Sequence, residues 1–254
     1  MLNSYRKLCT QFYDLDKPAA PETELAFYEA LARETVAGAG SAAILEPMCG
    51  SGRFLVPLLE RGFDVDGVDA SPDMLDACRR KCADRGLNPT LRLQMLHELE
   101  MQRRYALAII PAGSFELIER DFARPALSRL HAHLLPGGRL VLEAHVRRRR
   151  DAYAGPWGGR WVTRPDGAKI VISWLGTYDP TTAVQRSVHR YDLVKDGRLL
   201  ETEFDDFGGP VYDRAELTGM LIDAGFAEVR CLKAYALREP DDADEEAVYV
   251  ATRR

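Results

Sequence analysis

The strongest constraint on this fold is a regular alternation of strand-like and helix-like segments over residues 43–146. Short runs of aliphatic residues are followed by segments whose apolar residues recur with helical spacing. Parallel strands need a long crossover between them, so the alternation predicts a parallel sheet covered by helices on both faces. The predicted strands are 43–48, 63–70, 90–96, 105–113 and 138–146, separated by predicted helices at 53–61, 71–86 and 121–135.

The first predicted strand ends in a glycine-containing loop. Its apolar residues 43–45 are followed by Glu46 and then by the run Pro47-Met48-Cys49-Gly50-Ser51-Gly52. Two glycines let the backbone turn sharply and approach a ligand without a Cβ in the way. Ligands of open parallel sheets bind beyond the carboxyl ends of the strands, which makes this loop a candidate binding segment. An ordinary strand-to-helix turn is the alternative.

The pattern changes after the fifth predicted strand. Short strand-like segments separated by turn signals fill residues 157–209, and Lys195-Asp196-Gly197 has the composition of a hairpin turn. A helix is predicted over 213–226, and strands at 227–237 and 245–253 close the chain. We therefore predict an α/β fold: a doubly wound, mostly parallel sheet formed by 1–146 and 212–254, with 147–211 inserted as an antiparallel β subdomain.

Composition excludes several classes of protein. The chain has 254 residues and a net charge of -5, which disfavours a bulk nucleic-acid binder or a membrane-surface protein. The longest apolar run, 106–112, is too short to span a bilayer, and the N-terminus lacks the apolar core of a signal peptide. Five scattered cysteines favour a reducing cytoplasm, and their spacing predicts no metal site.

Motifs at successive strand ends resemble those of class I S-adenosylmethionine-dependent methyltransferases. They are the loop Glu46–Gly52, then "GVDASPDML" from residue 67, then "LLPGGRLVLE" from residue 134. The resemblance covers about residues 43–145, together with the closing helix and the last two strands. By layout alone, the antiparallel insertion is similar to that of amino-sugar and glycine N-methyltransferases.

The resemblance implies S-adenosylmethionine as the cofactor and a small molecule as the methyl acceptor. It implies that the glycine loop wraps the methionine part of the cofactor, and that Arg53 pairs with the methionine carboxylate. Asp69, which ends the second predicted strand, is implied to accept hydrogen bonds from both ribose hydroxyls. The complete predicted set of cofactor-binding residues is Glu46, Met48, Gly50, Gly52, Arg53, Asp69, Ala70, Met74, Leu96, Pro111 and Phe115.

Two positions depart from the pattern of the family. Met48 replaces the first glycine of the loop, which excludes the closest backbone approach at that point. Met95 and Leu96 follow the third predicted strand, where many relatives carry an acid that holds the adenine amino group. Backbone groups, His97 or Glu98 are the alternatives for that contact.

Candidate catalytic residues are fewer. His145, at the end of the fifth predicted strand, is a candidate general base because the ordinary pKa of histidine suits proton removal near neutrality. Tyr13 is a candidate lid residue, since an N-terminal aromatic residue folds over the active site in related enzymes. The run Arg147–Arg150 is either a solvated loop or a clamp for an anionic substrate. A monomer and a homodimer are both compatible with the sequence.

Two rival functions remain open at this stage. A nicotinamide-dependent oxidoreductase would need G-x-G-x-x-G, but Leu55 stands where the third glycine belongs. A protein that binds S-adenosylmethionine without catalysis is suggested by Met48 and Met95. Binding measurements with S-adenosylmethionine, S-adenosylhomocysteine and NADH separate the oxidoreductase from the other two.

Overall fold

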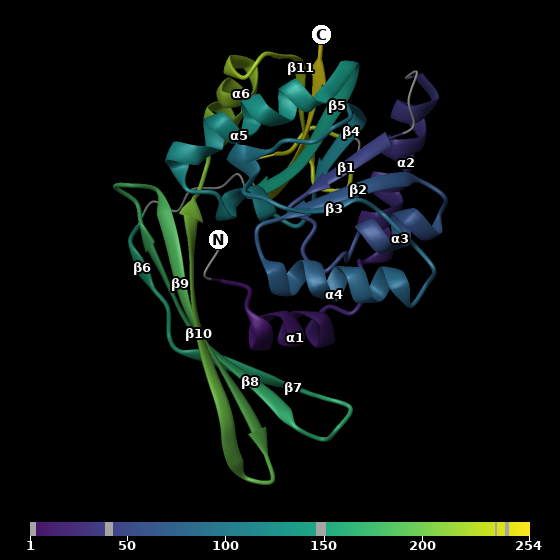
Figure 1. Cartoon of the computed structure of the whole chain (residues 1–254). Coiled ribbons are helices and arrows are strands. Elements are labelled where there is room, and N and C mark those ends of the chain that lie inside the picture. Colours follow the sequence, from purple (N-terminus) through teal and green to yellow (C-terminus); the bar gives the residue numbers. More distant parts are fainter. Residues whose placement is uncertain (1–3, 39–42, 146–150, 237, 242–243) are drawn as a thin grey trace.

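The computed structural model describes residues 4–38, 43–145, 151–236, 238–241 and 244–254. The described chain forms two β-sheets, one of seven strands and one of five. Helices cover both faces of the larger sheet, and the smaller sheet extends away from it (Figure 1). The strands of the smaller sheet lie between residues 153 and 210, and the strands of the larger sheet lie before and after them in the sequence.

The larger sheet has the order β11-β12-β5-β4-β1-β2-β3. Strands β1 to β5 run parallel, while β12 is antiparallel to both of its neighbours. This arrangement confirms the predicted fold class. The strands are β1 (Ala43–Pro47), β2 (Asp64–Asp69), β3 (Leu91–Leu93), β4 (Tyr105–Ile110), β5 (Leu134–His145), β11 (Phe226–Lys233) and β12 (Glu246–Arg253).

Two apolar layers sandwich this sheet. Helices α2 (Glu22–Gly38), α3 (Leu55–Glu60) and α4 (Pro72–Ala83) pack on one face, where Tyr28, Leu55 and Leu75 are buried. Helices α5 (Arg120–His133) and α6 (Arg214–Asp223) pack on the other face. The strands between them are apolar on both faces, as expected for a doubly covered parallel sheet.

Local sequence signals place the helix that follows β2. Ser71 accepts a hydrogen bond from the backbone N–H of Met74 at 3.2 Å, so it is the N-cap of α4. Pro72 occupies the first position of the helix, where its missing N–H costs nothing. This helix therefore begins where the sequence predicts, directly after the carboxyl end of β2.

The boundary between α5 and β5 differs from the prediction. The sequence predicts a helix to residue 135 and a strand from residue 138, but β5 already begins at Leu134. Its pairing with β4 shifts from Tyr105↔Leu134 to Leu107↔Arg139, so the residues around Pro136-Gly137-Gly138 bulge out of the ladder. A proline and two glycines end the helical pattern but do not prevent strand pairing around such a bulge.

The smaller sheet is antiparallel, with the order β10-β9-β8-β6 and with β7 also paired to β8. Asp196 and Gly197 have φ angles of 51° and 72°, the left-handed conformations that a two-residue hairpin turn requires. The predicted hairpin between β9 and β10 is confirmed. The strands are β6 (Tyr153–Ala154), β7 (Gly158–Thr163), β8 (Lys169–Asp179), β9 (Val184–Lys195) and β10 (Arg198–Pro210).

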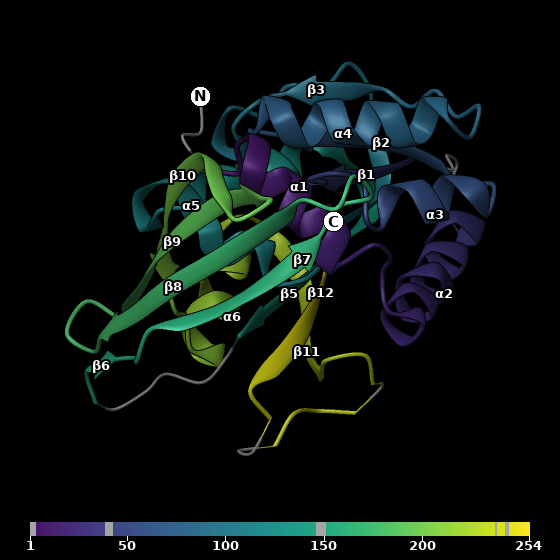
Figure 2. The ribbon, with the colours of Figure 1, turned by 90° about the horizontal axis from the view of Figure 1, so that it is seen from below.

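Helix α1 (Lys7–Asp16) joins the two sheets. Its apolar side chains Leu8, Cys9 and Phe12 pack against the inner face of the smaller sheet. Its other side approaches α4, so the helix lies between the smaller sheet and the larger one (Figures 1 and 2).

Candidate active site

Asp69 ties together the ends of two neighbouring parallel strands. It is the last residue of β2, and its Oδ2 accepts a hydrogen bond from the backbone N–H of Gly50 at 2.7 Å. Its Oδ1 accepts another from the backbone N–H of Ser71 at 2.8 Å. Burial raises the pKa of the Asp69 carboxyl, and these backbone donors partly offset the shift. The carboxylate is therefore fixed beside the glycine loop.

The glycine loop keeps a tight turn despite the methionine within it. Met48 has a φ angle of 64° and Gly50 one of 53°, so both adopt the left-handed conformation. For a residue with a side chain this conformation costs about 1–2 kcal/mol. The Met48 side chain packs against the buried core below α5 and α6, which compensates for the strain. Met48 thus occupies a backbone conformation that favours glycine.

A large cavity lies beyond these strand ends, between β1 and β4, where the strand order of the sheet reverses. Such a switch point is the usual ligand site of a doubly wound sheet. The cavity has a volume of about 1140 Å³, its open mouth included. We call it the first cavity. The predicted residues on its wall are Tyr13, Glu46, Met48, Gly50, Arg53, Asp69, Ala70, Met74, Leu96 and Pro111.

Glu46 is a buried acid on this wall with an unsatisfied oxygen. It is 2% exposed, and its Oε2 has no hydrogen-bond partner among the described residues. Burial raises the pKa of its carboxyl well above the ordinary value. A buried carboxylate oxygen without a donor is costly, so this position favours a ligand that supplies an N–H or a positive charge.

Another part of the wall is apolar and aromatic. Ala70, Met74, Leu96 and Phe122 line it, and the polar Gln94 lies on the same wall; the sequence predicts the first three of these as cofactor contacts. The ring of Phe122 stacks on His97, with 4.1 Å between the ring centroids. His97 lines the cavity, whereas Glu98 is exposed and lies off the wall. Of the two side chains named as alternatives to the missing acid, only His97 lines the cavity, and backbone groups remain the third alternative.

Two predicted cofactor contacts are not on the wall. Phe115 is completely buried in the core, where its ring lies 6.0 Å from that of Tyr212. The prediction that Phe115 contacts a ligand is therefore wrong. Gly52 faces away from the cavity, and a Cβ there would lie 2.8 Å from Cys78 Sγ. This glycine allows the loop to pack closely on α4 rather than to approach a ligand.

The loop after β4 turns Phe115 inward. Ala112 and Gly113 have φ angles of 58° and 66°, and a 3₁₀ turn, η2 (Ser114–Leu117), follows them. Because of this turn, Ala112, Ser114 and Leu117 line the first cavity while the ring of Phe115 enters the core. We call residues 111–117 the β4 loop.

A second cavity opens on the other side of the β4 loop. It shares Tyr5, Tyr13, Ala112, Ser114 and Leu117 with the first cavity, so the two are adjacent. The remaining wall comes from separate parts of the chain. These residues are Lys17, Gly113, Glu116, His145, Gln185, Ser187, Phe207, Gly208, Gly209, Pro210 and Val211.

His145 lines the second cavity rather than the first. Glu116 Oε2 lies 2.7 Å from His145 Nδ1, and Glu116 Oε1 accepts a hydrogen bond from the backbone N–H of His145 at 2.7 Å. The hydrogen bond with Glu116 raises the pKa of His145 to about 9. At neutral pH the ring is therefore protonated, in contrast to the ordinary histidine that the sequence predicts at this position. The run Arg147–Arg150 that follows lies outside the described residues.

Strand β10 closes the second cavity by direct backbone contact with the β4 loop. A Cβ built on Gly209 would lie 1.6 Å from the carbonyl oxygen of Glu116, so no side chain fits there. Gln185 and Ser187, on the paired strand β9, complete this side of the wall. The inserted sheet thus supplies one wall of the second cavity and the larger sheet supplies the other.

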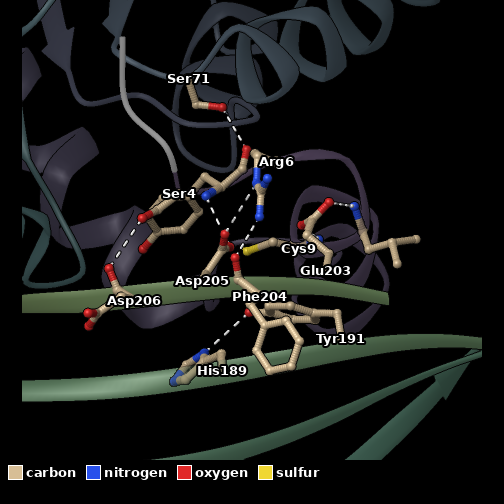
Figure 3. A network of polar contacts seen from close by, with 12 residues as sticks. Ser4, Arg6, Cys9, Ser71, His189, Tyr191, Glu203, Phe204, Asp205 and Asp206 are labelled. Carbon is tan, nitrogen blue, oxygen red and sulfur yellow. Dashed lines mark hydrogen bonds and ion pairs between the residues drawn. The ribbon is translucent and has the colours of Figure 1, made fainter. Parts of the chain in front are cut away.

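Buried carboxylates hold the N-terminal segment over both cavities. Glu203 of β10 accepts hydrogen bonds from the backbone N–H groups of Leu8 and Cys9, at 3.1 and 3.0 Å. Asp205 accepts one from the backbone N–H of Tyr5 at 3.2 Å, and the hydroxyl of Ser71 donates to the carbonyl of Tyr5 at 2.7 Å. Figure 3 shows these contacts converging on the start of α1. Tyr5 and Tyr13 thereby reach the boundary between the cavities.

A second set of contacts ties α1 to the glycine loop. Asp14 Oδ1 accepts hydrogen bonds from the hydroxyl of Ser51 at 2.5 Å and from Lys81 Nζ at 2.6 Å. Ser51 belongs to the glycine loop and Lys81 to α4, so α1 is fixed to two segments beside the first cavity.

Among the described residues, no group of three or more histidine, cysteine or acidic side chains is placed to hold a metal ion. No helix in the described part of the chain is both long and apolar enough to cross a membrane.

Comparison with known proteins relates the glycine loop and the first strands to one family. Residues 44–138 match the family described as a methyltransferase domain. The ubiquinone biosynthesis O-methyltransferase of Rickettsia akari (strain Hartford) is 25% identical over 183 residues, which are 71% of this chain. The match covers 66% of that relative, just under two thirds of its length.

Solved structures match over nearly the whole chain. An S-adenosylmethionine-dependent methyltransferase from Clostridium acetobutylicum ATCC 824 has a TM-score of 0.77 at 16% identity, covering 99% of both chains. CalS10, an amino pentose methyltransferase from Micromonospora echinaspora, has a TM-score of 0.71 at 20% identity and covers 100% of both chains. At these identities the likeness concerns the fold, which extends over both sheets.

Proposed function

We propose that this chain is a class I S-adenosylmethionine-dependent methyltransferase, which methylates an oxygen or nitrogen atom of a small molecule; the match of residues 44–138 to a methyltransferase domain and the shared fold support this. The first cavity binds the cofactor and the second cavity binds the methyl acceptor. The observation that carries this proposal is the position of Asp69, hydrogen-bonded to the glycine loop at the switch point of the sheet. A carboxylate held there is suited to the hydroxyls of a ribose.

The residues of the first cavity fit the cofactor in charge and polarity. The unsatisfied Oε2 of Glu46 suits an ammonium group, and Arg53 on the same wall suits a carboxylate. The two together match the amino acid end of S-adenosylmethionine. Ala70, Met74, Leu96 and the stacked pair His97–Phe122 offer an apolar surface to a purine ring.

The protein contributes mainly by holding two molecules in adjacent cavities. Bound S-adenosylmethionine supplies an electrophilic methyl group on a positively charged sulfur. The chain's own residues bring the acceptor beside it, and such positioning alone lowers a barrier by about 7–11 kcal/mol in well-oriented reactions. Tyr5, Tyr13, Ala112, Ser114 and Leu117 line both cavities and therefore surround the position where the two ligands meet.

His145 acts in the acceptor cavity as a hydrogen-bond donor. Glu116, at its Nδ1, and Glu246, whose Oε1 lies 3.6 Å from its Nε2, raise its pKa to about 9, so at neutral pH the ring is a cation rather than a base. We therefore revise its predicted role from general base to substrate-binding cation. Together with Lys17 on the same wall, it supports an acceptor that carries an anionic group. Tyr13 retains its predicted role as a lid residue.

The finer predictions of location and assembly are retained as part of the proposal. The cysteines Cys9, Cys49, Cys78, Cys82 and Cys231 are all free, which supports a reducing compartment such as the cytoplasm. A monomer or a homodimer remains our prediction for the assembly, and size-exclusion chromatography with light scattering distinguishes the two.

Isothermal titration calorimetry tests the cofactor assignment. We expect micromolar or tighter binding of S-adenosylmethionine and S-adenosylhomocysteine and no binding of NADH. Tight binding of NADH, with no heat from either sulfur compound, would contradict the proposal. Methyl transfer is then measured by incubating the protein with S-adenosylmethionine and a panel of amines, phenols and hydroxy acids, with mass spectrometry for products 14 Da heavier, about the mass of one CH₂.

A further inference from the structure

Glu143 is a buried acid that the cofactor and acceptor contacts leave unused. It lies on β5, is 5% exposed, and lines neither cavity. Its Oε2 accepts a hydrogen bond from the backbone N–H of Ala112 at 2.8 Å and another from the hydroxyl of Tyr235. Burying a carboxylate costs free energy unless it is hydrogen-bonded, so the groups that donate hydrogen bonds to Glu143 indicate its role.

The first of these partners is a strained residue at the boundary of the cavities. Ala112 has a φ angle of 58° and lines both cavities. The left-handed conformation costs an alanine about 1–2 kcal/mol, so contacts from outside the loop must hold it. The carboxylate of Glu143 supplies such a contact, because a hydrogen bond to a charged acceptor contributes about 1.5–3 kcal/mol.

The second partner fixes the direction of the carboxylate. Tyr235 follows β11, and its ring packs edge-on against Phe27 and Tyr28 of α2, with centroid distances of 5.9 and 6.3 Å. Its hydroxyl is thereby held over Glu143. The carboxylate is thus bound from one side by the helical layer and from the other by the β4 loop.

Strand β5 holds the β4 loop at a second point. Glu143 and His145 are two residues apart, so their side chains leave the strand on the same face. His145 binds both oxygens of Glu116, near the end of the β4 loop, while Glu143 binds Ala112 near its beginning. The segment that separates the two cavities is therefore anchored to one rigid strand at both ends.

We propose that Glu143 is a positioning residue. It holds Ala112, so that the β4 loop keeps the cofactor cavity and the acceptor cavity in a fixed position relative to each other. It acts through the backbone of Ala112 and touches neither ligand. This inference rests on the proposed function, since it concerns the separation between the two binding sites.

Three substitutions test this assignment. Glu143→Leu removes both hydrogen bonds, Glu143→Gln keeps an oxygen that accepts from Ala112, and Tyr235→Phe removes only the second partner. Tyr249→Phe is the control for the loss of a tyrosine hydroxyl, because Tyr249 is buried on β12 and its hydroxyl makes no hydrogen bond to Glu143 or to the β4 loop. Glu143→Gln and Tyr235→Phe keep the test valid if Glu143→Leu fails to fold.

The measurements are amide hydrogen exchange by mass spectrometry and calorimetric binding of S-adenosylhomocysteine. In Glu143→Leu we expect exchange in a peptide covering 111–117 to rise at least tenfold, as for the loss of a buried hydrogen bond of about 1.4 kcal/mol or more. We expect Tyr235→Phe to raise it by a smaller factor, and Glu143→Gln and Tyr249→Phe to remain close to the wild type. Peptides covering 43–60 should not change.

Affinity for S-adenosylhomocysteine should fall several-fold in Glu143→Leu and recover in Glu143→Gln. Unchanged exchange of 111–117 in folded Glu143→Leu and Tyr235→Phe would overturn the assignment, as would a uniform rise across the whole chain. If the wild type itself does not bind S-adenosylhomocysteine, the proposed function fails, while the exchange data still decide whether Glu143 holds the loop.

Discussion

The two cavities are built in opposite ways. Most of the wall of the first cavity comes from short segments at the ends of strands of the larger sheet, such as Glu46–Arg53 and Asp69–Met74, and the N-terminal segment adds Tyr5 and Tyr13. The wall of the second cavity combines α1, the β4 loop, the end of β5 and two strands of the inserted sheet. The first therefore depends on local turns at one edge of a sheet, and the second depends on how two sheets dock. A substitution at a residue that lines only one of the cavities should therefore leave the other cavity unchanged.

The largest effect is expected at Asp69. Asp69→Ala removes a carboxylate that holds the amides of Gly50 and Ser71 and is proposed to bind the ribose. Affinity for S-adenosylhomocysteine should fall ten- to hundredfold, because each charge-assisted hydrogen bond contributes about 1.5–3 kcal/mol. Isothermal titration calorimetry measures the change. Asp84→Ala, which removes an exposed acid beyond the end of α4, is the matched control and should bind as the wild type does.

Equal affinity in wild-type protein and folded Asp69→Ala would contradict the ribose assignment. It would also remove the distinction drawn between the two cavities, since the first would then not depend on the strand-end carboxylate. A loss of affinity of the same size in Asp84→Ala would show that net charge, rather than the position of Asp69, governs binding.

The residues of the first cavity could be predicted because their signals are local. Glu46, Gly50, Asp69 and Met74 lie within a few residues of strand ends that hydrophobicity alone indicates, and parallel strands place those ends at one edge. The error at Phe115 is equally local. The sequence does not reveal that a 3₁₀ turn follows Gly113, and this turn rotates the ring from the cavity into the core.

The second cavity could not be predicted, because its composition depends on register and docking. The contact between Gly209 and Glu116 joins residues 93 positions apart, and no periodicity in either segment indicates it. The pairing of His145 with Glu116 is likewise absent from any motif, so its raised pKa was missed. The fold class is confirmed because it rests on the order of elements, whereas this site rests on individual contacts.

An intermediate effect is expected at the contact between the sheets. Gly209→Ala places a methyl group on the carbonyl oxygen of Glu116, so β10 must move away from the β4 loop. Overpacking of this kind costs about 1–3 kcal/mol, which corresponds to a fall of roughly 2–12 °C in Tm for a chain of this size. Differential scanning calorimetry measures the shift.

Gly176→Ala is the matched control for this substitution. Gly176 lies on β8 of the same sheet, where the nearest atom to a new Cβ is the carbonyl oxygen of Arg186 at 3.9 Å. Its Tm should remain within about 2 °C of the wild type, since exposed substitutions without a clash stay near ±0.5 kcal/mol. Binding of S-adenosylhomocysteine should be nearly unchanged in both variants. A tenfold loss in Gly209→Ala alone would mean that the two cavities are not independent.

The smallest effect concerns the pair His145–Glu116, in which the histidine is exposed and the glutamate is largely buried. The pKa of His145 is raised to about 9 from an ordinary value near 6.5, so the charged ring stabilises the folded state fully below about pH 6.5. This contribution is lost as the pH rises through 9. Because the side chain of His145 is 51% exposed, solvent screening limits this contribution to the free energy of unfolding to about 1 kcal/mol or less.

Urea unfolding of wild-type protein and His145→Gln at pH 6.5 and pH 10 measures this contribution, since the effects of the other titrating groups cancel in the comparison. The wild type should be the more stable at pH 6.5 and should lose that advantage at pH 10. An advantage that is equal at both pH values, or larger at pH 10, would show that Glu116 does not hold the proton of His145, and the second cavity would then lack the cation proposed to bind its ligand.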